Sequence, residues 1–409
     1  MTALNVVVGV AGGIAAYKAC HVVRNFTESG ANVRVVPTPN ALEFVGAATF
    51  EALSGNPVET GVFTRVDEVQ HVRVGQEADL VVIAPATADL LARLAVGRAD
   101  DLLSATVLVA TCPVVVAPAM HTEMWRNPAT QANVATLRAR GITVLEPASG
   151  RLTGADSGPG RLLEPDQIAD LARTVLDTGP IRRSLEGRRV LISAGGTQEN
   201  IDPVRFIGNR SSGRQGFALG EIAAQRGADV TIVAGDTDAL PTPAGAEIVR
   251  VRSAREMQRE VDARLAGADI VVMAAAVADY RPEEEATSKL KKGEADADLS
   301  RLRLVENPDI LKGVVDKRNA QQLRTVIAGF AAETDNPLEY GRVKLERKGA
   351  DFLMVNSVAG GKVFGERRNS GWILGRDGSQ IEVADGSKLA VAAQILDAAE
   401  GALGRSLPN

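Results

Sequence analysis

The chain has 409 residues, of which 45% are hydrophobic and 3% aromatic, and its formal net charge is −5. This length predicts two or three domains, and the charge and scarce aromatic side chains argue against nucleic acid as a partner. The two cysteines, Cys20 and Cys112, are too few for a disulfide framework or a thiolate metal site, and we expect them to be buried rather than catalytic. No run approaches the roughly 20 apolar residues of a membrane span. We therefore expect a soluble, cytoplasmic protein that contacts neither nucleic acid nor membrane.

Short apolar runs alternate with helical patterns in the first half of the chain. This alternation is typical of βαβ units around a parallel sheet that helices cover on both faces. The expected strands are 6–10, 33–36, 80–84, 114–117 and 143–145, and the expected helices are 15–29, 90–96 and 130–140.

The α/β pattern breaks near Gly179-Pro180 and then restarts. We place a linker at 179–187, between a first domain at 1–178 and a second at 188–409. The charged segment 283–298 is expected to be a mobile loop. The second half has expected strands at 190–193, 230–234, 270–274, 325–329 and 352–355, a hairpin of 371–374 with 380–383, and a helix at 387–402 that Ser387 caps.

The first strand of each half runs into a glycine pair. These pairs are Gly12-Gly13 and Gly195-Gly196. A buried strand that leads through glycines into a helix presents backbone N–H groups to a phosphate. The architecture of the two halves is therefore alike, and each opening is a candidate nucleotide site.

The first opening is not a dinucleotide fingerprint. That fingerprint needs glycine where Ala11 and Ile14 stand, and it needs an acid after the second strand, where Thr38 stands instead. A threonine hydroxyl at this place suits the single phosphate of a mononucleotide. On the glycine pattern alone, a tight strand–helix turn without a ligand is an equally good interpretation.

Two further strand ends of the first half carry small or hydroxyl-bearing residues, 84–88 and 118–120. Ligands of open α/β sheets bind beyond the carboxyl ends of strands, so these turns converge on the first opening. Together with Gly12 to Lys18, they resemble the flavin-dependent cysteine decarboxylases, and within them the decarboxylase half of the bifunctional phosphopantothenoylcysteine decarboxylase/phosphopantothenate–cysteine ligases. The resemblance implies a flavodoxin-like domain that binds FMN through Gly12, Gly13, Thr38, Thr87, Ala88, Thr106 and Met120.

The same resemblance assigns two histidines. It implies that His71 acts on the substrate carboxylate or as an acid/base, whereas an ordinary surface histidine is the alternative. His121 stands where the family has asparagine, and we assign it to the catalytic site because imidazole also donates hydrogen bonds. Gly154 stands where the family's flap has a cysteine, and we expect His121 or a flap residue to supply the last proton in its place. A non-catalytic, flavin-binding regulatory domain is therefore an alternative for the first half.

The second opening has different side chains around it. A Ser/Gly loop with arginines at 208–216 leads into a helix and suits an anion, although capping by Ser211 and Ser212 also explains the serines. Small residues at 274–278 let a flat base approach, and Asp279 can hold a ribose or a metal. Lysines at 289–292 are ordinarily solvated, but beside a triphosphate they would form a charge clamp.

With 307–310 and 330–334, these motifs resemble the ligase half of the same bifunctional family, in the same order along the chain. The resemblance implies a Rossmann-like domain that uses CTP and Mg²⁺, with Asp279 as metal ligand, Lys289 and Asn209 as catalytic residues, and Arg205, Arg210 and Arg214 on the substrate. Arg214 stands where lysine is common. The implied nucleotide contacts are Ala274, Ala275, Asp279, Lys289, Asn307, Pro308, Asp309, Ile310, Phe330, Lys344 and Lys348.

By resemblance, the chain catalyses two consecutive steps of coenzyme A biosynthesis. CTP activates 4′-phosphopantothenate as an acyl-cytidylate, L-cysteine displaces CMP, and the FMN-dependent half decarboxylates 4′-phosphopantothenoylcysteine to 4′-phosphopantetheine. The resemblance also implies a homo-oligomer, a dodecamer of decarboxylase trimers and ligase dimers. A nicotinamide-dependent oxidoreductase is the remaining alternative, which the missing acid after the second strand disfavours.

Overall fold

The computed structural model describes residues 3–58, 70–152, 156–291, 302–333, 336–357 and 368–405. Contacts between Cα atoms divide the chain into two units, Met1–Arg182 and Arg183–Asn409, and the division falls within the expected linker at 179–187. Leu185 is buried, and its backbone N–H donates to the carbonyl oxygen of Arg226 at 3.0 Å. The last part of the expected linker therefore packs onto the second unit.

The first unit is built on a parallel sheet of five strands in the order β2-β1-β3-β4-β5. This is the flavodoxin-like order, and the sequence predicts all five strands. Because helices cover both faces, β3 and β4 are buried along their whole length, which is why their sequences read as continuous apolar runs. The strands are β1 (Asn5–Val10), β2 (Asn32–Pro37), β3 (Leu80–Ala86), β4 (Val114–Pro118) and β5 (Thr143–Val144).

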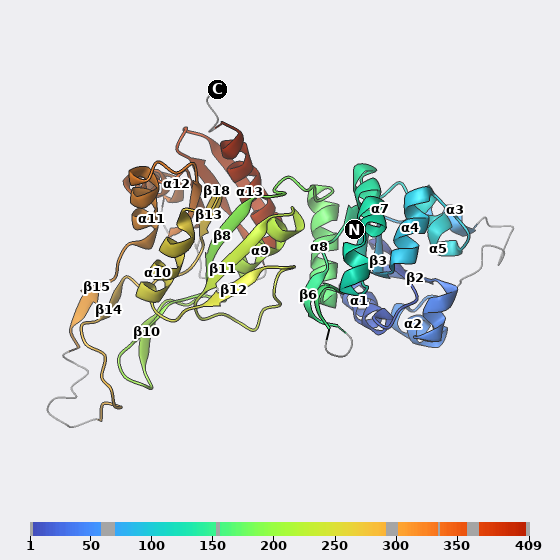
Figure 1. Ribbon diagram of the computed structural model, residues 1–409, viewed down its shortest axis with the longest axis horizontal. Coiled ribbons are helices and arrows are strands. Elements are labelled where there is room, and N and C mark those ends of the chain that lie inside the picture. Colours follow the sequence, from blue (N-terminus) through green and yellow to red (C-terminus); the bar gives the residue numbers. More distant parts are fainter. Residues whose placement is uncertain are drawn as a thin grey trace. The chain divides into compact units, whose positions relative to one another are not determined.

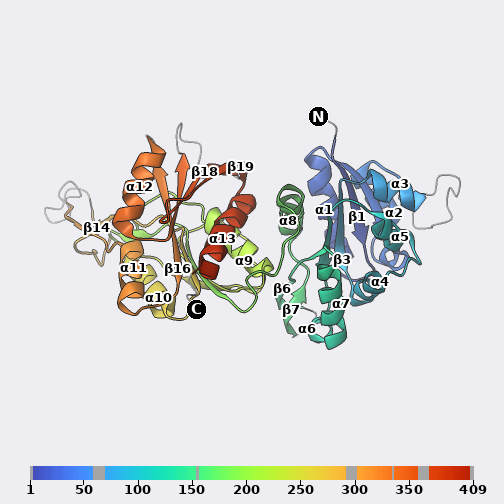
Figure 2. The ribbon, with the colours of Figure 1, turned by 90° about the horizontal axis from the view of Figure 1, so that it is seen from above.

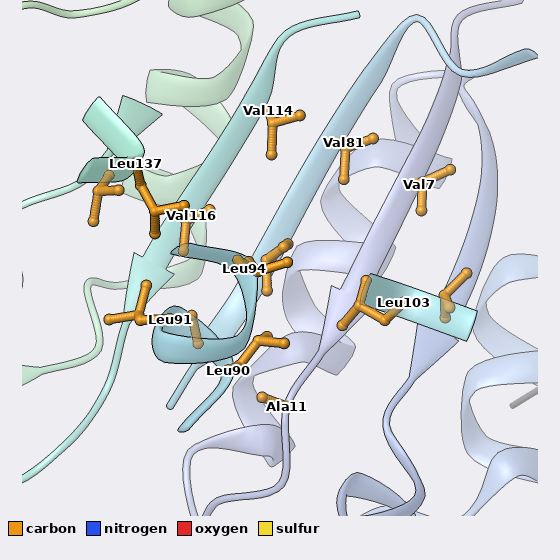
Figure 3. Packing of buried hydrophobic residues seen from close by; sticks show 14 of the residues in the cluster. Val7, Ala11, Val81, Leu90, Leu91, Leu94, Leu103, Val114, Val116 and Leu137 are labelled. Carbon is orange, nitrogen blue, oxygen red and sulfur yellow. The ribbon is translucent and has the colours of Figure 1, made fainter. Parts of the chain in front are cut away.

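Helices lie on both faces of this sheet (Figure 2). One face is covered by α1 (Ala16–Glu28) and α8 (Pro165–Thr178). Figure 3 shows the core of the other face, where the strand residues Val81 and Val116 belong to one cluster with the helix residues Leu90 and Leu103. That face is covered by α3 (Gln70–Glu77), α4 (Ala88–Val96), α5 (Leu102–Val109) and α7 (Pro128–Ala139); the unit also contains η1 (Pro39–Glu43), α2 (Ala47–Ser54), α6 (Thr122–Arg126), β6 (Ala148–Arg151) and β7 (Ser157–Arg161).

Helix α5 is absent from the sequence-based expectation. Its residues are apolar on nearly every side, so no 3.6-residue period marks it. The signal that identifies it is the capping box, in which Asp101 accepts from the N–H of Ser104 at 2.8 Å.

The second unit has an eight-stranded sheet in the order β12-β11-β8-β13-β16-β17-β18-β19. The first six strands are parallel and follow the Rossmann order, and the last two are antiparallel. Strand β16 is longer than expected, because Phe330 to Glu333 continue its pairing with β17. The strands are β8 (Arg189–Ala194), β11 (Asp229–Ala234), β12 (Glu247–Arg250), β13 (Ile270–Met273), β16 (Val326–Glu333), β17 (Phe352–Ser357), β18 (Arg368–Gly375) and β19 (Gln380–Ser387).

This sheet is also covered on both faces (Figure 2). On one face lie α10 (Ala254–Leu265), α11 (Ile310–Ala320) and α12 (Pro337–Lys348). On the other lie α9 (Arg214–Gln225) and α13 (Lys388–Arg405). The expected cap of the closing helix is confirmed, since Ser387 Oγ accepts from the N–H of Ala390 at 3.1 Å.

Two antiparallel ribbons that the sequence pattern did not predict extend from the second unit (Figure 1). They pair β9 (Gln198–Asn200) with β10 (Phe206–Gly208), and β14 (Tyr280–Pro282) with β15 (Leu304–Glu306). Residues 283–291, here called the lysine segment, fall in the expected mobile loop but are hydrogen-bonded to neighbouring chain, whereas 292–298 lie outside the described residues. Across the parts of the chain that the structure describes, no helix is long and apolar enough to cross a membrane.

Candidate active sites

The carboxyl ends of β1, β2 and β3 meet at the first glycine opening. The N–H of Thr38 donates to Val10 O at 2.8 Å, and the N–H of Ala11 donates to Pro85 O at 3.0 Å. A Cβ atom built on Gly13 would lie 3.6 Å from Cγ2 of Thr87. The structure therefore brings Gly13, Thr38 and Thr87 to one edge of the sheet, as the sequence predicts.

This opening fits a phosphate group. Thr38 is 3% exposed, and its buried Oγ1 makes no hydrogen bond to any described residue. A Cβ atom on Gly12 would lie 2.5 Å from Cβ of Asn40, so only glycine fits there. Helix α1 begins without a side-chain cap. Backbone N–H groups at a helix start, beside an unpaired hydroxyl, are the donors that a phosphate such as that of FMN requires.

Three other residues expected to contact the flavin, Thr87, Ala88 and Thr106, lie in or beside helices α4 and α5. Thr87 caps α4, where its hydroxyl accepts from Leu90 N–H at 3.3 Å, and Ala88 is the first residue of that helix. Thr106 is buried in α5, and its hydroxyl donates to Leu102 O at 2.7 Å. The Thr106 hydroxyl is therefore satisfied within its own helix, and its contact with a flavin stays a prediction.

His71 lies in the first turn of α3 and is half-buried. Its Nδ1 atom is buried and makes no hydrogen bond to any described residue. The helix packs closely on α5, because a Cβ atom on Gly75 would lie 2.8 Å from Thr106 O. A buried ring nitrogen without a partner is available to a ligand group, although none of the described contacts joins His71 to Gly12 or Gly13.

His121 lies directly after β4, where the base of the flap hairpin β6–β7 packs against it. The N–H of Met120 donates to Gly160 O at 2.9 Å, and a Cβ atom on Gly158 would lie 2.5 Å from Thr122 Oγ1. Met120 packs against the core and His121 is half-buried. Thr122, which no sequence motif singled out, has a buried Oγ1 without a partner among the described residues. Gly154, the flap position without a cysteine, lies outside the described residues.

The two cysteines are half-buried rather than fully buried. Burial raises the pKa of both the Cys20 and the Cys112 thiol, so neither is a ready thiolate at neutral pH. Cys112 packs against the core of its unit.

The second opening joins three predicted segments. The N–H of Ala276 donates to Gly195 O at 2.8 Å, and Nδ2 of Asn209 donates to Val277 O at 2.9 Å. A Cβ atom on Gly196 would lie 2.7 Å from Asn209 O. The glycine pair, the expected catalytic asparagine and the small-residue turn after β13 therefore lie together.

Two hydroxyl side chains shape that turn. Oγ of Ser193 accepts from Ala275 N–H at 3.2 Å, and Oγ1 of Thr197 accepts from Ala278 N–H at 3.0 Å. Sequence reasoning gave Ser193 no role. The sequence signal for Ser193 is its hydroxyl near the carboxyl end of β8, where the preceding residues are apolar.

Asp279 and Asn307 are also brought together. The N–H of Asn307 donates to Asp279 O at 2.7 Å, and its Nδ2 donates to Ala278 O at 2.8 Å. The Asn307 amide therefore already supports the turn, while the Asp279 carboxylate is exposed. Among the described residues, no group of three or more His, Cys, Asp and Glu side chains is arranged to hold a metal.

Asp309 and Lys348 contact one another rather than standing apart. Asp309 caps α11 and forms an ion pair with Lys348. Burial raises the pKa of the Asp309 carboxyl, but the hydrogen bonds from Lys348 and the Lys312 N–H, together with the nearby positive charges, outweigh burial and hold this pKa below its usual range. The other expected nucleotide residues on these elements are Pro308, Phe330 and Lys344, which are half-buried, and Ile310, which belongs to the core.

The three expected substrate arginines have different surroundings. Arg205 binds the buried carboxylate of Asp202, with Nη2 to Oδ2 at 2.5 Å. Arg214 pairs with Asp238 at 3.0 Å, and Arg210 is exposed. Lys289 is exposed on the lysine segment, next to Leu290, whose carbonyl accepts from Arg205 at 2.8 Å. Asp202, like Thr122 and Ser193, is a candidate that the sequence pattern did not indicate.

Two family models together match nearly the whole chain. Residues 1–176 match a family described as Flavoprotein, and residues 185–402 match the DNA/pantothenate metabolism flavoprotein C-terminal domain. The chain is 58% identical over 399 residues to the Coenzyme A biosynthesis bifunctional protein CoaBC of Mycolicibacterium smegmatis, covering 96% of each. It is 43% identical over 395 residues to the protein of that name from Vibrio parahaemolyticus, also covering 96% of each.

Among solved structures, the chain is 35% identical to the C-terminal domain of a Coenzyme A biosynthesis bifunctional protein CoaBC. That match covers 55% of this chain and 99% of that one, with a TM-score of 0.46. Neither a nicotinamide-dependent oxidoreductase nor a purely regulatory flavoprotein is favoured by these similarities. The chain belongs to the family of coenzyme A biosynthesis bifunctional proteins and is a bifunctional enzyme, with a flavoprotein decarboxylase domain followed by a ligase domain.

Proposed function

We propose that the first unit holds FMN at the Gly12–Thr38 opening and decarboxylates 4′-phosphopantothenoylcysteine. The observation that carries this assignment is the buried hydroxyl of Thr38, which has no hydrogen-bond partner in the described parts of the chain and lies beside backbone that only glycine permits. When bound there, FMN supplies the redox chemistry that makes loss of carbon dioxide from the cysteine end feasible.

The residues of the first unit then have separate roles. His71 has a buried ring nitrogen without a partner among the described residues, which suits a hydrogen bond or proton transfer to the substrate carboxylate. His121 lies where the flap hairpin packs on the turn after β4, in reach of a substrate that the flap covers. With both cysteine thiols raised in pKa, we assign the final proton to His121 or to a flap residue rather than to a thiolate.

For the second unit we propose ligation of 4′-phosphopantothenate to L-cysteine at the expense of CTP. The small-residue turn at 274–278 lets the base approach, and the exposed Asp279 lies beside it. Asn209, held over Gly196 by its bond to Val277, is placed at the edge where the reacting acyl group would lie. Lys289 is an exposed cation that would stabilise negative charge on the transferring phosphoryl group.

Magnesium would bind here mainly through the nucleotide. Mg²⁺ ordinarily takes one or two carboxylates together with substrate phosphates and water, so a single exposed carboxylate such as Asp279 suffices on the protein side. This agrees with the described residues, which hold no preformed cluster of three ligands.

We further propose that the ligase units pair through their two ribbons. Large apolar side chains are exposed there: Phe206 is 49% exposed, and Tyr280 and Leu304 are each 47% exposed. Apolar side chains clustered on projecting ribbons favour burial against a second copy. The implied trimers of the decarboxylase unit, the dodecamer and a cytoplasmic location stay predictions.

One experiment tests both activities. The purified chain is incubated with 4′-phosphopantothenate, L-cysteine, CTP and Mg²⁺, and the products are identified by mass. We expect pyrophosphate, CMP, 4′-phosphopantothenoylcysteine and finally 4′-phosphopantetheine. Accumulation of 4′-phosphopantothenoylcysteine in a flavin-loaded protein would favour the regulatory alternative for the first unit, and absence of pyrophosphate would refute the ligase assignment.

A further inference from the structure

The buried carboxylate of Asp202 accepts hydrogen bonds from Val204, Arg205 and Leu290, and none of the expected roles uses it. Its side chain is fully buried. Oδ1 accepts from the backbone N–H groups of Val204 and Arg205, each at 2.8 Å. Oδ2 accepts from Arg205 Nε at 2.9 Å and Nη2 at 2.5 Å, and from Leu290 N–H at 3.2 Å.

The resulting ion pair holds the backbone of Leu290 at two points. Its N–H donates to Asp202, and its carbonyl accepts from Arg205 Nη2 at 2.8 Å. Leu290 lies between Lys289 and Lys291, both exposed. Because the peptide groups on both sides of Leu290 are hydrogen-bonded, the ammonium groups of Lys289 and Lys291 are confined to a smaller region.

Two more hydrogen bonds tie the lysine segment to the same strip of chain. The N–H of Ala286 donates to Ile201 O at 3.0 Å, and Asn200 Nδ2 donates to Glu285 Oε1 at 2.8 Å. Residues 200–205 therefore bind the lysine segment at several points, from Glu285 to Leu290. The lysine segment is rich in charged side chains and poor in apolar ones, so these polar contacts, rather than packing in a hydrophobic core, determine its position.

We propose that Asp202 is a positioning residue for the ligase reaction, which holds Leu290 through an ion pair with Arg205 and so places Lys289 against the nucleotide phosphates. The proposal rests on the proposed ligase function. It also changes the expectation for Arg205, which binds Asp202 and Leu290 instead of standing free for the acyl group. Asp202 neutralises Arg205, whereas Lys289 and Lys291 are exposed on the lysine segment.

A first test measures how easily the lysine segment leaves its hydrogen bonds, and it does not depend on ligase activity. Trypsin cleaves after Lys289 only when the surrounding backbone can leave its hydrogen bonds. Asp202→Asn should speed cleavage of the Lys289–Leu290 bond, identified by mass, by about tenfold, since hydrogen bonds to a charged group are lost. A rate within about twofold of the unsubstituted chain would overturn the proposal.

Asp351 gives a matched control in the same unit. Its carboxylate pairs with Arg318 at 2.5 Å and accepts from Ile327 N–H at 2.8 Å, at the amino ends of β16 and β17. Asp351→Asn removes a comparable ion pair and should leave cleavage after Lys289 unchanged. Equal acceleration by both variants would mean general destabilisation and would also overturn the proposal.

A second test asks whether Asp202 acts through Lys289. We expect Asp202→Asn to slow pyrophosphate release from CTP about tenfold in the unsubstituted chain, but by less than about twofold in a Lys289→Gln background. Equal effects in the two backgrounds would refute the coupling. If the unsubstituted chain releases no pyrophosphate, the proposed ligase function fails, while the trypsin comparison still decides the position of Leu290.

Discussion

The two glycine openings use the same backbone device but surround it with different groups. In the first unit α1 begins at Ala16, soon after Gly13, and the nearby Thr38 hydroxyl has no hydrogen-bond partner among the residues that the structure describes. In the second unit, residues 197–213 separate Gly196 from α9 and carry a ribbon, Asn209 and the Asp202–Arg205 pair. The first opening is thus a compact anion cradle, whereas the second adds charged side chains that a reaction with a triphosphate needs.

A strand–glycine–helix pattern therefore establishes where a ligand binds at the sheet edge, but it does not establish the chemistry of that site. Both sheets place this edge where the strand order reverses, between β1 and β3 and between β8 and β13. What is bound and transformed there depends on the segments inserted after the glycines. The following substitutions separate the two openings, beginning with the largest expected effect.

His71→Asn should reduce carbon dioxide release from 4′-phosphopantothenoylcysteine by about 10²- to 10⁴-fold, the usual contribution of a general acid/base. Ligation, measured as pyrophosphate release, should be unaffected, because His71 belongs to the first unit. His21→Asn is the control, since His21 is exposed on α1. Unchanged carbon dioxide release from the His71 variant would refute its role.

Lys289→Gln should slow pyrophosphate release by about 10²- to 10³-fold, as for the loss of one group that stabilises transition-state charge. The flavin spectrum should be retained, since the lysine belongs to the second unit. Lys312→Gln is the matched control, because Lys312 is an exposed lysine that pairs with Asp316 on α11. A normal ligation rate in the Lys289 variant would contradict the charge clamp.

Thr38→Val should weaken FMN binding by about tenfold to a hundredfold, the range for one hydrogen bond to a charged group. Equilibrium titration of the apoprotein, followed by flavin fluorescence, measures this. Thr143→Val is a close control, because Thr143 is equally buried and its Oγ1 also has no partner among the described residues, but it lies at the amino end of β5. Equal losses in both variants would mean that Thr38 contributes only to folding.

The smallest effect concerns pH. The hydrogen bonds from Arg205 hold the pKa of Asp202 well below its usual range. Since the folded pKa is lower than the unfolded one, Asp202 contributes stability above about pH 3.9, and this contribution is lost as the pH falls further toward the folded value. The unsubstituted chain should therefore be more stable than Asp202→Asn at pH 7, and the gap should begin to narrow as the pH falls below about 4.

Urea unfolding of the second unit measures this gap. The chain has two tryptophans, Trp125 and Trp372, so a Trp125→Phe background leaves Trp372 as the reporter on β18. Midpoints are compared at several pH values between 7 and 3. A stability gap that stays constant over that range would show that the ionised carboxylate of Asp202 contributes nothing.

The sequence alone predicts every parallel strand of the two sheets except the edge strand β12, because buried strands require apolar runs such as 80–84 and 190–193, whereas β12 is only partly buried. It also determined the binding edges, since glycine pairs and small-residue turns are local requirements of close backbone approach. The Ser387 cap followed from sequence for the same reason, because capping involves only adjacent residues.

Which polar side chains already form hydrogen bonds or ion pairs within the protein depends on the tertiary structure. Asn307 is engaged with Ala278, Arg205 with Asp202, and Lys348 with Asp309, in each case through a partner distant in the chain or hidden in a loop without periodicity. The short ribbons and the all-apolar helix α5 also escaped prediction, since neither has a repeating pattern. Hydrogen-bond partners at long sequence separation depend on how loops return to the sheet edge, and no local rule of propensity or spacing encodes that path.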